Sequence, residues 1–307
     1  GDTHAKRGTL IGTSSAFGGA SGGTPLVPSW LEGGGSDDGA PGDPRSDESG
    51  SDAPPPGNDP SAPPAAPPER TATPVPGETD RYTSARTNFT RYARSGGDDR
   101  RSMGRAVSQY VSRSSGGAAR AARRMGSSRG AASRLATILG QVGNAGIGEV
   151  LRSLDLGGLA GRPIEEVFAG LADFICPDGG SIDEGIARDA FIETIADLAD
   201  AGITEIDGLT ADQMQTVFEL YIGHTIEARI CNDIGTRVVN MPSDVRTVER
   251  IEAQLQEFIQ RSVSDAVSAS GVDLGSISRE DVTGFVDRVY EATFELLEAA
   301  GEAEADT

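Results

Sequence analysis

The chain has 307 residues, a formal net charge of -20 and a pI of about 4.4. This charge excludes general electrostatic attraction of the whole chain to nucleic acid or to an anionic membrane. Because 36% of the residues are hydrophobic and 5% aromatic, and a long low-complexity region uses part of the length, the sequence supports one or two modest cores. The two cysteines, Cys176 and Cys231, are too few for a disulfide framework.

The charge is unevenly distributed along the chain. Residues 32–80 carry 11 acids and 2 bases, residues 81–134 carry 2 acids and 13 bases, and residues 135–307 carry 33 acids and 10 bases. The sequence shows no hydrophobic signal core and no run of about 18 apolar residues. We therefore expect a soluble, cytoplasmic protein that makes no membrane contact.

Residues 12–31 read GTSSAFGGASGGTPLVPSWL, which is too rich in glycine for a helix or a strand. Its second half is apolar and stiffened by prolines, so a flexible tether ends in an extended apolar peptide. Such a peptide is typical of a ligand for the groove of a partner. The expected docking residues are Pro25, Leu26, Val27, Pro28, Trp30 and Leu31.

Residues 32–80 consist mainly of proline, glycine, serine and aspartate, which predicts a disordered acidic linker behind the flexible 1–31 segment. From residue 81 to about 300 the apolar residues recur at helical spacing, and no alternating strand competes with them. We expect an all-α domain with basic helices over 81–142 and an acidic helical body over 143–300. Residues 301–307 are expected to form a disordered acidic tail.

Start and stop signals locate the helices of the body. Ser181 with Glu184 and Thr210 with Gln213 are predicted capping boxes, and Gly235 is a predicted C-cap. Further helix starts are expected at Pro163, Ser243 and Ser278, and a third basic helical segment from Ala118 to about Gly140. The glycine-rich 140–148 stretch reads as a turn between helices.

Catalytic and metal-binding patterns are weak. The GTSSAFGGAS stretch lacks the lysine and the preceding strand of a phosphate-binding loop. His224, Glu227 and Cys231 share one helix face, yet no second histidine is near, so we interpret them as a packed face and not as a metal site. The CPDGGSIDE turn lacks calcium-loop spacing. With no nucleophile and histidine arrangement, we predict no catalytic residue, no metal and no enzyme activity.

The basic segment interleaves arginines with Tyr82, Phe89, Tyr92 and Tyr110, a combination that nucleic-acid surfaces use. Pairing with an acidic surface, either that of the acidic body or that of a partner protein, is the favoured interpretation, because the acidic body would repel a polyanion elsewhere. A nucleic-acid-binding sensor is the alternative function. The residues expected to make either contact are Arg81, Arg86, Arg91, Arg94, Arg100, Arg101 and Arg105.

Three stretches resemble the QatB family, a component of the four-gene Qat anti-phage defence system of bacteria. They are GTSSAFGG with TPLVPSWL, YVSRSSGGAARAARRMGSSR, and FICPDGGSIDEGIARDAFIET. The resemblance implies a non-enzymatic protein that works beside the ATPase QatA, the TatD-like nuclease QatD and QatC, which resembles the deazaguanine-synthesising enzyme QueC.

The resemblance also implies a covalent modification. QueC-like enzymes activate a deazaguanine carboxylate with ATP, and in defence relatives the attacking amine is taken to be a protein's N-terminal glycine. No cofactor is implied apart from such a deazaguanine adduct on the N-terminus. The family begins close to the GTS motif, whereas this chain carries GDTHAKRGTLI before it. Gly12 is therefore the expected acceptor, and Gly1 is the alternative.

Overall fold

A computed structural model describes residues 81–177, 179–204, 206, 208–235 and 241–307. The chain divides into two units, Gly1–Glu69 and Arg70–Thr307, and every described residue belongs to the second. No strand occurs in these described ranges, so the expected all-α fold is confirmed.

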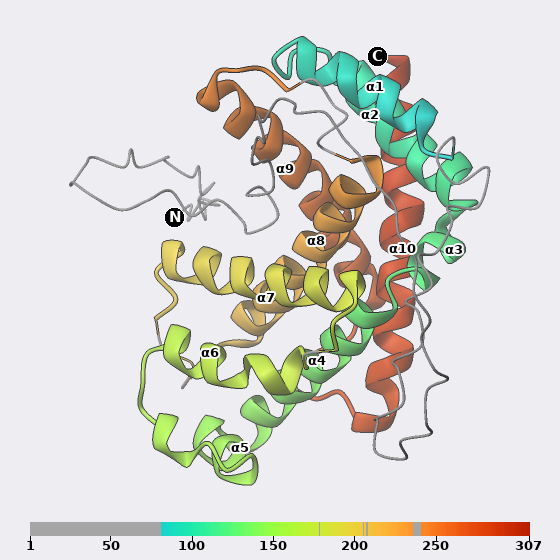
Figure 1. Cartoon of the computed structure of the whole chain (residues 1–307). Helices are drawn as coiled ribbons and strands as arrows, with labels where there is room; N and C mark the ends of the chain where they lie inside the picture. Colours follow the sequence, from blue (N-terminus) through green and yellow to red (C-terminus); the bar gives the residue numbers. More distant parts are fainter. Residues whose placement is uncertain (1–80, 178, 205, 207, 236–240) are drawn as a thin grey trace, which may run out of the picture. The chain divides into compact units, whose positions relative to one another are not determined.

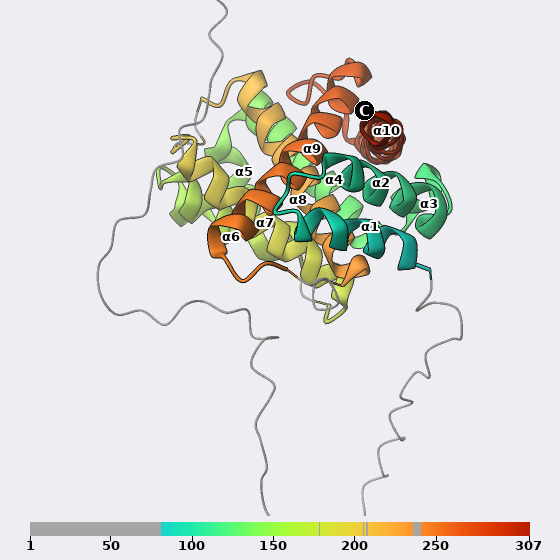
Figure 2. The same ribbon diagram turned by 90° about the horizontal axis from the view of Figure 1, so that it is seen from above.

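The helices follow one another in a simple order (Figure 1). They are α1 (Thr83–Arg94), α2 (Arg100–Gln109), a π-helix η2 (Tyr110–Ser115), α3 (Ala118–Arg123), α4 (Gly126–Ala145), α5 (Ile147–Ser153), a 3-10 turn η3 (Gly157–Leu159), α6 (Ile164–Ile175), α7 (Ile182–Asp200), α8 (Ala211–Ile234), α9 (Val245–Ser270) and α10 (Arg279–Asp306). The long α10 packs along α2, α3, α4 and α9, while α8 lies between α7 and α9. Figure 2 shows α10 nearly end-on beside α2 and α3.

Local capping signals gave correct helix starts. The Ser181 hydroxyl accepts from the Glu184 amide while the Glu184 carboxylate accepts from the Ser181 amide, and Thr210 and Gln213 repeat this arrangement. Gly235 ends α8 and Ser278 caps α10, as expected. Pro163 is the N-cap residue of α6.

Three predicted boundaries were wrong. Helix α9 begins one residue later than expected, because the Asp244 carboxylate and not Ser243 accepts from the Thr247 amide. The basic segment from Ala118 is broken at Arg124 into α3 and α4. The 140–148 stretch is mostly helix, since α4 continues to Ala145 and turns at Gly146, where φ is 78°.

The expected disordered tail over 301–307 was also wrong, because α10 is helical to Asp306. The reason is packing against α2. A Cβ added to Gly104 would lie 2.6 Å from the carbonyl oxygen of Gly301, so the two backbones touch where both residues lack side chains. This contact supports the end of α10, which acidic composition alone did not predict.

Candidate functional site

The predicted modification acceptors and docking residues lie outside the described residues. They are Gly1, Gly12, Pro25, Leu26, Val27, Pro28, Trp30 and Leu31. These assignments stay predictions.

The seven arginines expected to contact a partner fall into two groups. Two of them bond within the fold: Arg81 Nε donates to the carbonyl oxygen of Ser114, and Arg86 Nε donates to that of Ile234 at 2.7 Å. The other five are exposed or half-buried: Arg91, Arg94, Arg100, Arg101 and Arg105. The structure therefore leaves only part of the predicted set for contacts outside the domain.

The aromatic residues between these arginines are buried. Tyr82, Phe89, Tyr92 and Tyr110 are at most 9% exposed, and Tyr82 stacks on Tyr110 with ring centres 5.9 Å apart. A base needs an exposed ring face for stacking. The positive charge of the segment therefore still supports nucleic-acid binding, whereas its aromatic residues do not.

Four donors converge on one carboxylate oxygen near the end of α8. Asp233 Oδ2 accepts from the hydroxyls of Tyr82 at 2.9 Å and Tyr110 at 3.0 Å, from Arg124 Nη2 at 3.2 Å and from Arg229 Nε at 3.3 Å. The Asp233 side chain is 8% exposed. Through it, the beginning of α1, the π-helix and the end of α3 are tied to α8.

The pKa values of three of these donors, Tyr82, Tyr110 and Arg229, are raised by their surroundings. Burial, together with the charge of Asp233, raises the pKa of Tyr82 to about 12 and that of Tyr110 well above its ordinary value. For Arg229, burial lowers the pKa, but Asp233 and Asp183 outweigh it and the net shift is upward. Both tyrosines and the arginine therefore donate to carboxylates at neutral pH.

Arg229 also contacts the FICPDGGSIDEGIARDAFIET stretch. Its Nη1 donates to Asp183 at the start of α7. Beside this ion pair, the beginnings of α4 and α7 and the end of α6 enclose an open hollow of about 300 Å³. The residues lining this hollow are Gly126, Ser127, Gly130, Ala131, Arg134, Cys176, Pro177, Glu184 and Ala187. The stretches YVSRSSGGAARAARRMGSSR and FICPDGGSIDEGIARDAFIET, remote in sequence, thus both line one hollow, the first through Gly126 and Ser127 and the second through Cys176, Pro177, Glu184 and Ala187.

Glycines at the hollow differ from those elsewhere in the helices. A Cβ added to Gly104, Gly140 or Gly301 would meet backbone within about 3 Å, whereas one added to Gly126 would meet nothing within 4 Å and one at Gly130 only its own helix's Arg134. Glycine within a helix costs stability relative to alanine. Close packing therefore explains why glycine occurs at positions 104, 140 and 301. No contact among the described residues requires glycine at positions 126 and 130.

The chain matches a protein family described as Qat anti-phage system associated protein QatB, over residues 116–297. The chain belongs to the QatB family. Membership in this family makes it a component of an anti-phage defence system, with other Qat components as its partners. No curated protein and no solved structure matches the chain.

The QatB match covers α3 to α9 and α10 as far as Leu297, including the hollow and Asp233. It does not extend to the GTSSAFGG and TPLVPSWL stretches, nor to α1 and α2. The family assignment therefore rests on the helical body. None of the helices in the described part of the chain has the length and apolar character needed to cross a membrane.

Of the three residues that share a face of α8, His224 is buried, and Glu227 and Cys231 are half-buried. His224 Nε2 lies 2.8 Å from Asp197 Oδ2. Burial, opposed by His224 and reinforced by Glu252, raises the pKa of Glu227 to about 7, and burial raises that of Cys231 to about 12. Within the described ranges, no group of three or more His, Cys, Asp or Glu residues is placed to hold a metal ion.

Sequence reasoning missed the Asp233 cluster and the hollow. The partners of Asp233 on Tyr82, Tyr110 and Arg124 lie between 109 and 151 positions away along the chain, so no local spacing signals them. The sequence did contain one signal for the hollow, namely Gly126 and Gly130, two glycines within the predicted basic helical segment. Cys176 lines the hollow, and burial raises its pKa to about 11, so its thiol stays protonated at neutral pH.

Proposed function

We propose that this QatB-family chain is a non-enzymatic subunit that docks on the QueC-like protein QatC through its N-terminal segment and receives a deazaguanine group there. Family membership carries the proposal. An amide bond forms between the glycine nitrogen and the activated deazaguanine carboxyl carbon. The ATP-derived activating group leaves, and the amine loses one proton. QatA and QatD are the further proposed partners.

The acceptor chemistry favours an N-terminal glycine over a side chain. An α-amine has a pKa near 8 and is partly deprotonated at neutral pH, whereas a lysine near 10.4 is not. The chain contains one lysine, Lys6. Glycine has no side chain to obstruct a narrow active site. We propose Gly12 as the acceptor after removal of the preceding residues, and Gly1 where they are retained.

The apolar peptide behind the acceptor is the proposed anchor. Trp30 is the only tryptophan of the chain, and Leu26 and Leu31 lie within five positions of it. Binding of an extended segment has an ordering cost, which burial of these side chains would offset. Residues 32–80 would then act as a tether that connects the anchor to the helical domain.

Calorimetric titration of the full chain with QatC tests this function. We expect Trp30→Ala to weaken association by about thirtyfold, since truncating a buried aromatic anchor commonly costs about 2 kcal/mol. Phe174→Ala, at a 45% exposed side chain of α6, is the matched control and should leave affinity unchanged. An unchanged affinity of Trp30→Ala, at an unchanged melting temperature, would remove the anchor.

A further inference from the structure

Arginines without carboxylate partners gather around the π-helix and α3. No aspartate or glutamate occurs between residues 100 and 148. Ion pairs engage two arginines of this stretch, Arg124 with Asp233 and Arg129 with Asp287. Arg113, Arg120 and Arg123 are exposed, and no ion pair among the described residues engages them.

The chain turns sharply between Arg113 on the π-helix and α3, where Arg120 and Arg123 are three positions apart and so share a helix face. Gly116 and Gly117 both have positive φ and join the π-helix to α3. The Arg120 guanidinium lies over this turn, since a Cβ on Gly116 would be 3.0 Å from its Nη1. Arg81, which precedes α1, is bonded within the fold beside this turn, where its Nε donates to the Ser114 carbonyl oxygen. We call Arg113, Arg120 and Arg123 the arginine surface.

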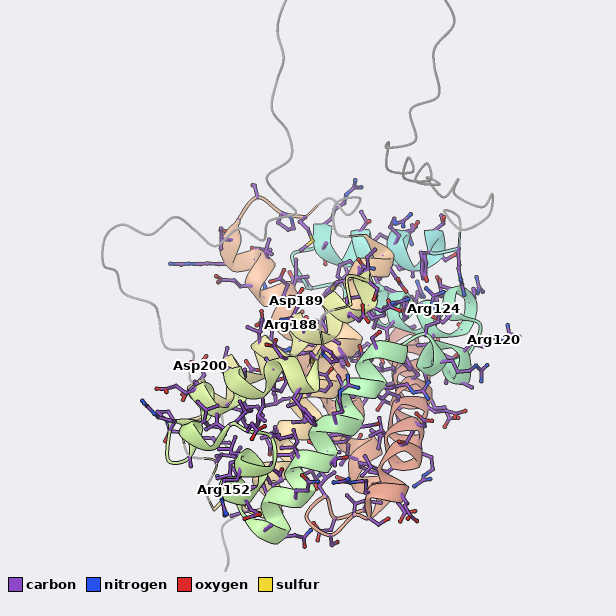
Figure 3. All side chains as sticks on the ribbon, turned by 60° about the horizontal axis from the view of Figure 1, so that its bottom comes forward. Arg120, Arg124, Arg152, Arg188, Asp189 and Asp200 are labelled. Carbon is purple, nitrogen blue, oxygen red and sulfur yellow. The ribbon has the colours of Figure 1, made fainter. Side chains whose placement is uncertain are left out.

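Figure 3 shows where one arginine of the surface, Arg120, lies relative to Arg124. Arg120 lies at the outer edge of the domain and extends away from the helices, whereas Arg124 lies further in, where it meets Asp233. The Arg124 guanidinium carbon is 5.8 Å from the Tyr82 ring centre, at the same distance as that of Arg81. Arg124 is thus used by the fold, whereas Arg120 remains available.

The π-helix beneath the surface carries an independent sign of a functional segment. Ser114 and Ser115 are each 1% exposed, and their hydroxyls have no hydrogen-bond partner among the described residues. One turn earlier, the Ser112 hydroxyl donates to the Ser108 carbonyl oxygen in the ordinary helical way. Unpaired buried hydroxyls reduce stability, and π-turns occur often at functional sites. The segment keeps this geometry at a cost to folding.

We propose that the arginine surface binds a carboxylate-rich segment of a partner protein. The guanidinium fork matches a carboxylate with two parallel hydrogen bonds. Two neighbouring arginines, Arg124 and Arg129, already pair with carboxylates within the fold. The proposal does not depend on the proposed N-terminal modification, so either can fail without the other.

A carboxylate-rich segment fits better than nucleic acid. The rings nearest the surface, Tyr82 and Tyr110, are buried and present no face for base stacking. Residues 135–307 carry 33 acids against 10 bases, and α10 from this region packs beside α3. A rod-like duplex would meet this acidic region, whereas a short peptide covers the arginines alone.

Fluorescence anisotropy with the full chain tests the proposal. The probe is a short labelled peptide of alternating Glu and Asp, compared with a Gly-Ser peptide and a DNA duplex at low and at physiological salt. We expect the acidic peptide to bind, more weakly as salt rises. The variant Arg113→Gln/Arg120→Gln/Arg123→Gln should bind it about tenfold more weakly.

A second variant separates the surface from net charge. Arg152→Gln/Arg246→Gln/Arg279→Gln removes the same charge from exposed arginines elsewhere and should bind like the parent. Arg120→Gln alone removes one of the three guanidinium groups and should show a smaller loss. Equal losses in the two triple variants, no binding of the acidic peptide, or tighter binding of the duplex would each overturn the proposal.

Discussion

Replacing the carboxylate of Asp233 should destabilise the helical domain more than any exposed ion pair does. In Asp233→Asn, Arg229 at 12% side-chain exposure and Arg124 at 26% lose their common counter-ion, and an amide replaces an oxygen that accepts four hydrogen bonds. Leaving a buried charge unpaired costs about 3–5 kcal/mol. Because Arg229 keeps Asp183 and Arg124 is partly solvated, we expect a loss of about 2–3 kcal/mol.

Thermal and denaturant unfolding followed by circular dichroism measure this loss. For a domain of more than 200 residues, about 2–3 kcal/mol corresponds to a fall in Tm of roughly 5–10 °C. Asp173→Asn makes the same chemical change in the Arg188 pair, where the aspartate side chain is 82% exposed, and should shift stability by less than about 0.5 kcal/mol. Equal effects of the two substitutions would refute the role given to Asp233.

Three further substitutions test the packing and the titration. Folding raises the pKa of Glu227 from 4.5 to about 7, so the folded state favours the protonated carboxyl group. The stability that this group contributes is complete below pH 4.5 and is lost as the pH rises through 7. Glu227→Gln should flatten that decline in denaturant titrations and stabilise the protein at pH 8, and an unchanged pH profile would contradict the shift. Gly104→Ala should destabilise by about 1–3 kcal/mol, because its Cβ meets the Gly301 carbonyl. Gly130→Ala should instead stabilise by about 0.5–1 kcal/mol through helix propensity, and a loss there would reveal a contact that the structure lacks.

The helical fold was predictable because its signals are local. Each capping box joins residues three positions apart, so the starts at Ser181 and Thr210 can be read from neighbouring letters. The end of α10 was missed because the Gly104–Gly301 contact joins distant helices. The π-helix was missed because Tyr110 and Val111 continue the apolar spacing of α2, and spacing does not distinguish an α-turn from a π-turn.

The candidate sites were likewise predictable only where the signal is local in the sequence. The arginine-rich composition correctly indicated a basic segment, yet Arg81 and Arg86 bond inside the fold and the exposed set extends to Arg113, Arg120 and Arg123. Which arginine is used internally depends on carbonyl groups and carboxylates brought close by tertiary packing. Composition gives the charge of a segment, and the fold decides which side chains present it to a partner.

Mass spectrometry of the chain produced with and without QatC tests the central claim most directly. We predict an intact-mass increase only when QatC and its deazaguanine substrate are both present, with fragment ions that locate the adduct on the α-amine of Gly12, or of Gly1 where the first residues are retained. A blocked N-terminus should prevent the increase. An adduct on Lys6 or another side chain, or no adduct with both components present, would contradict the account.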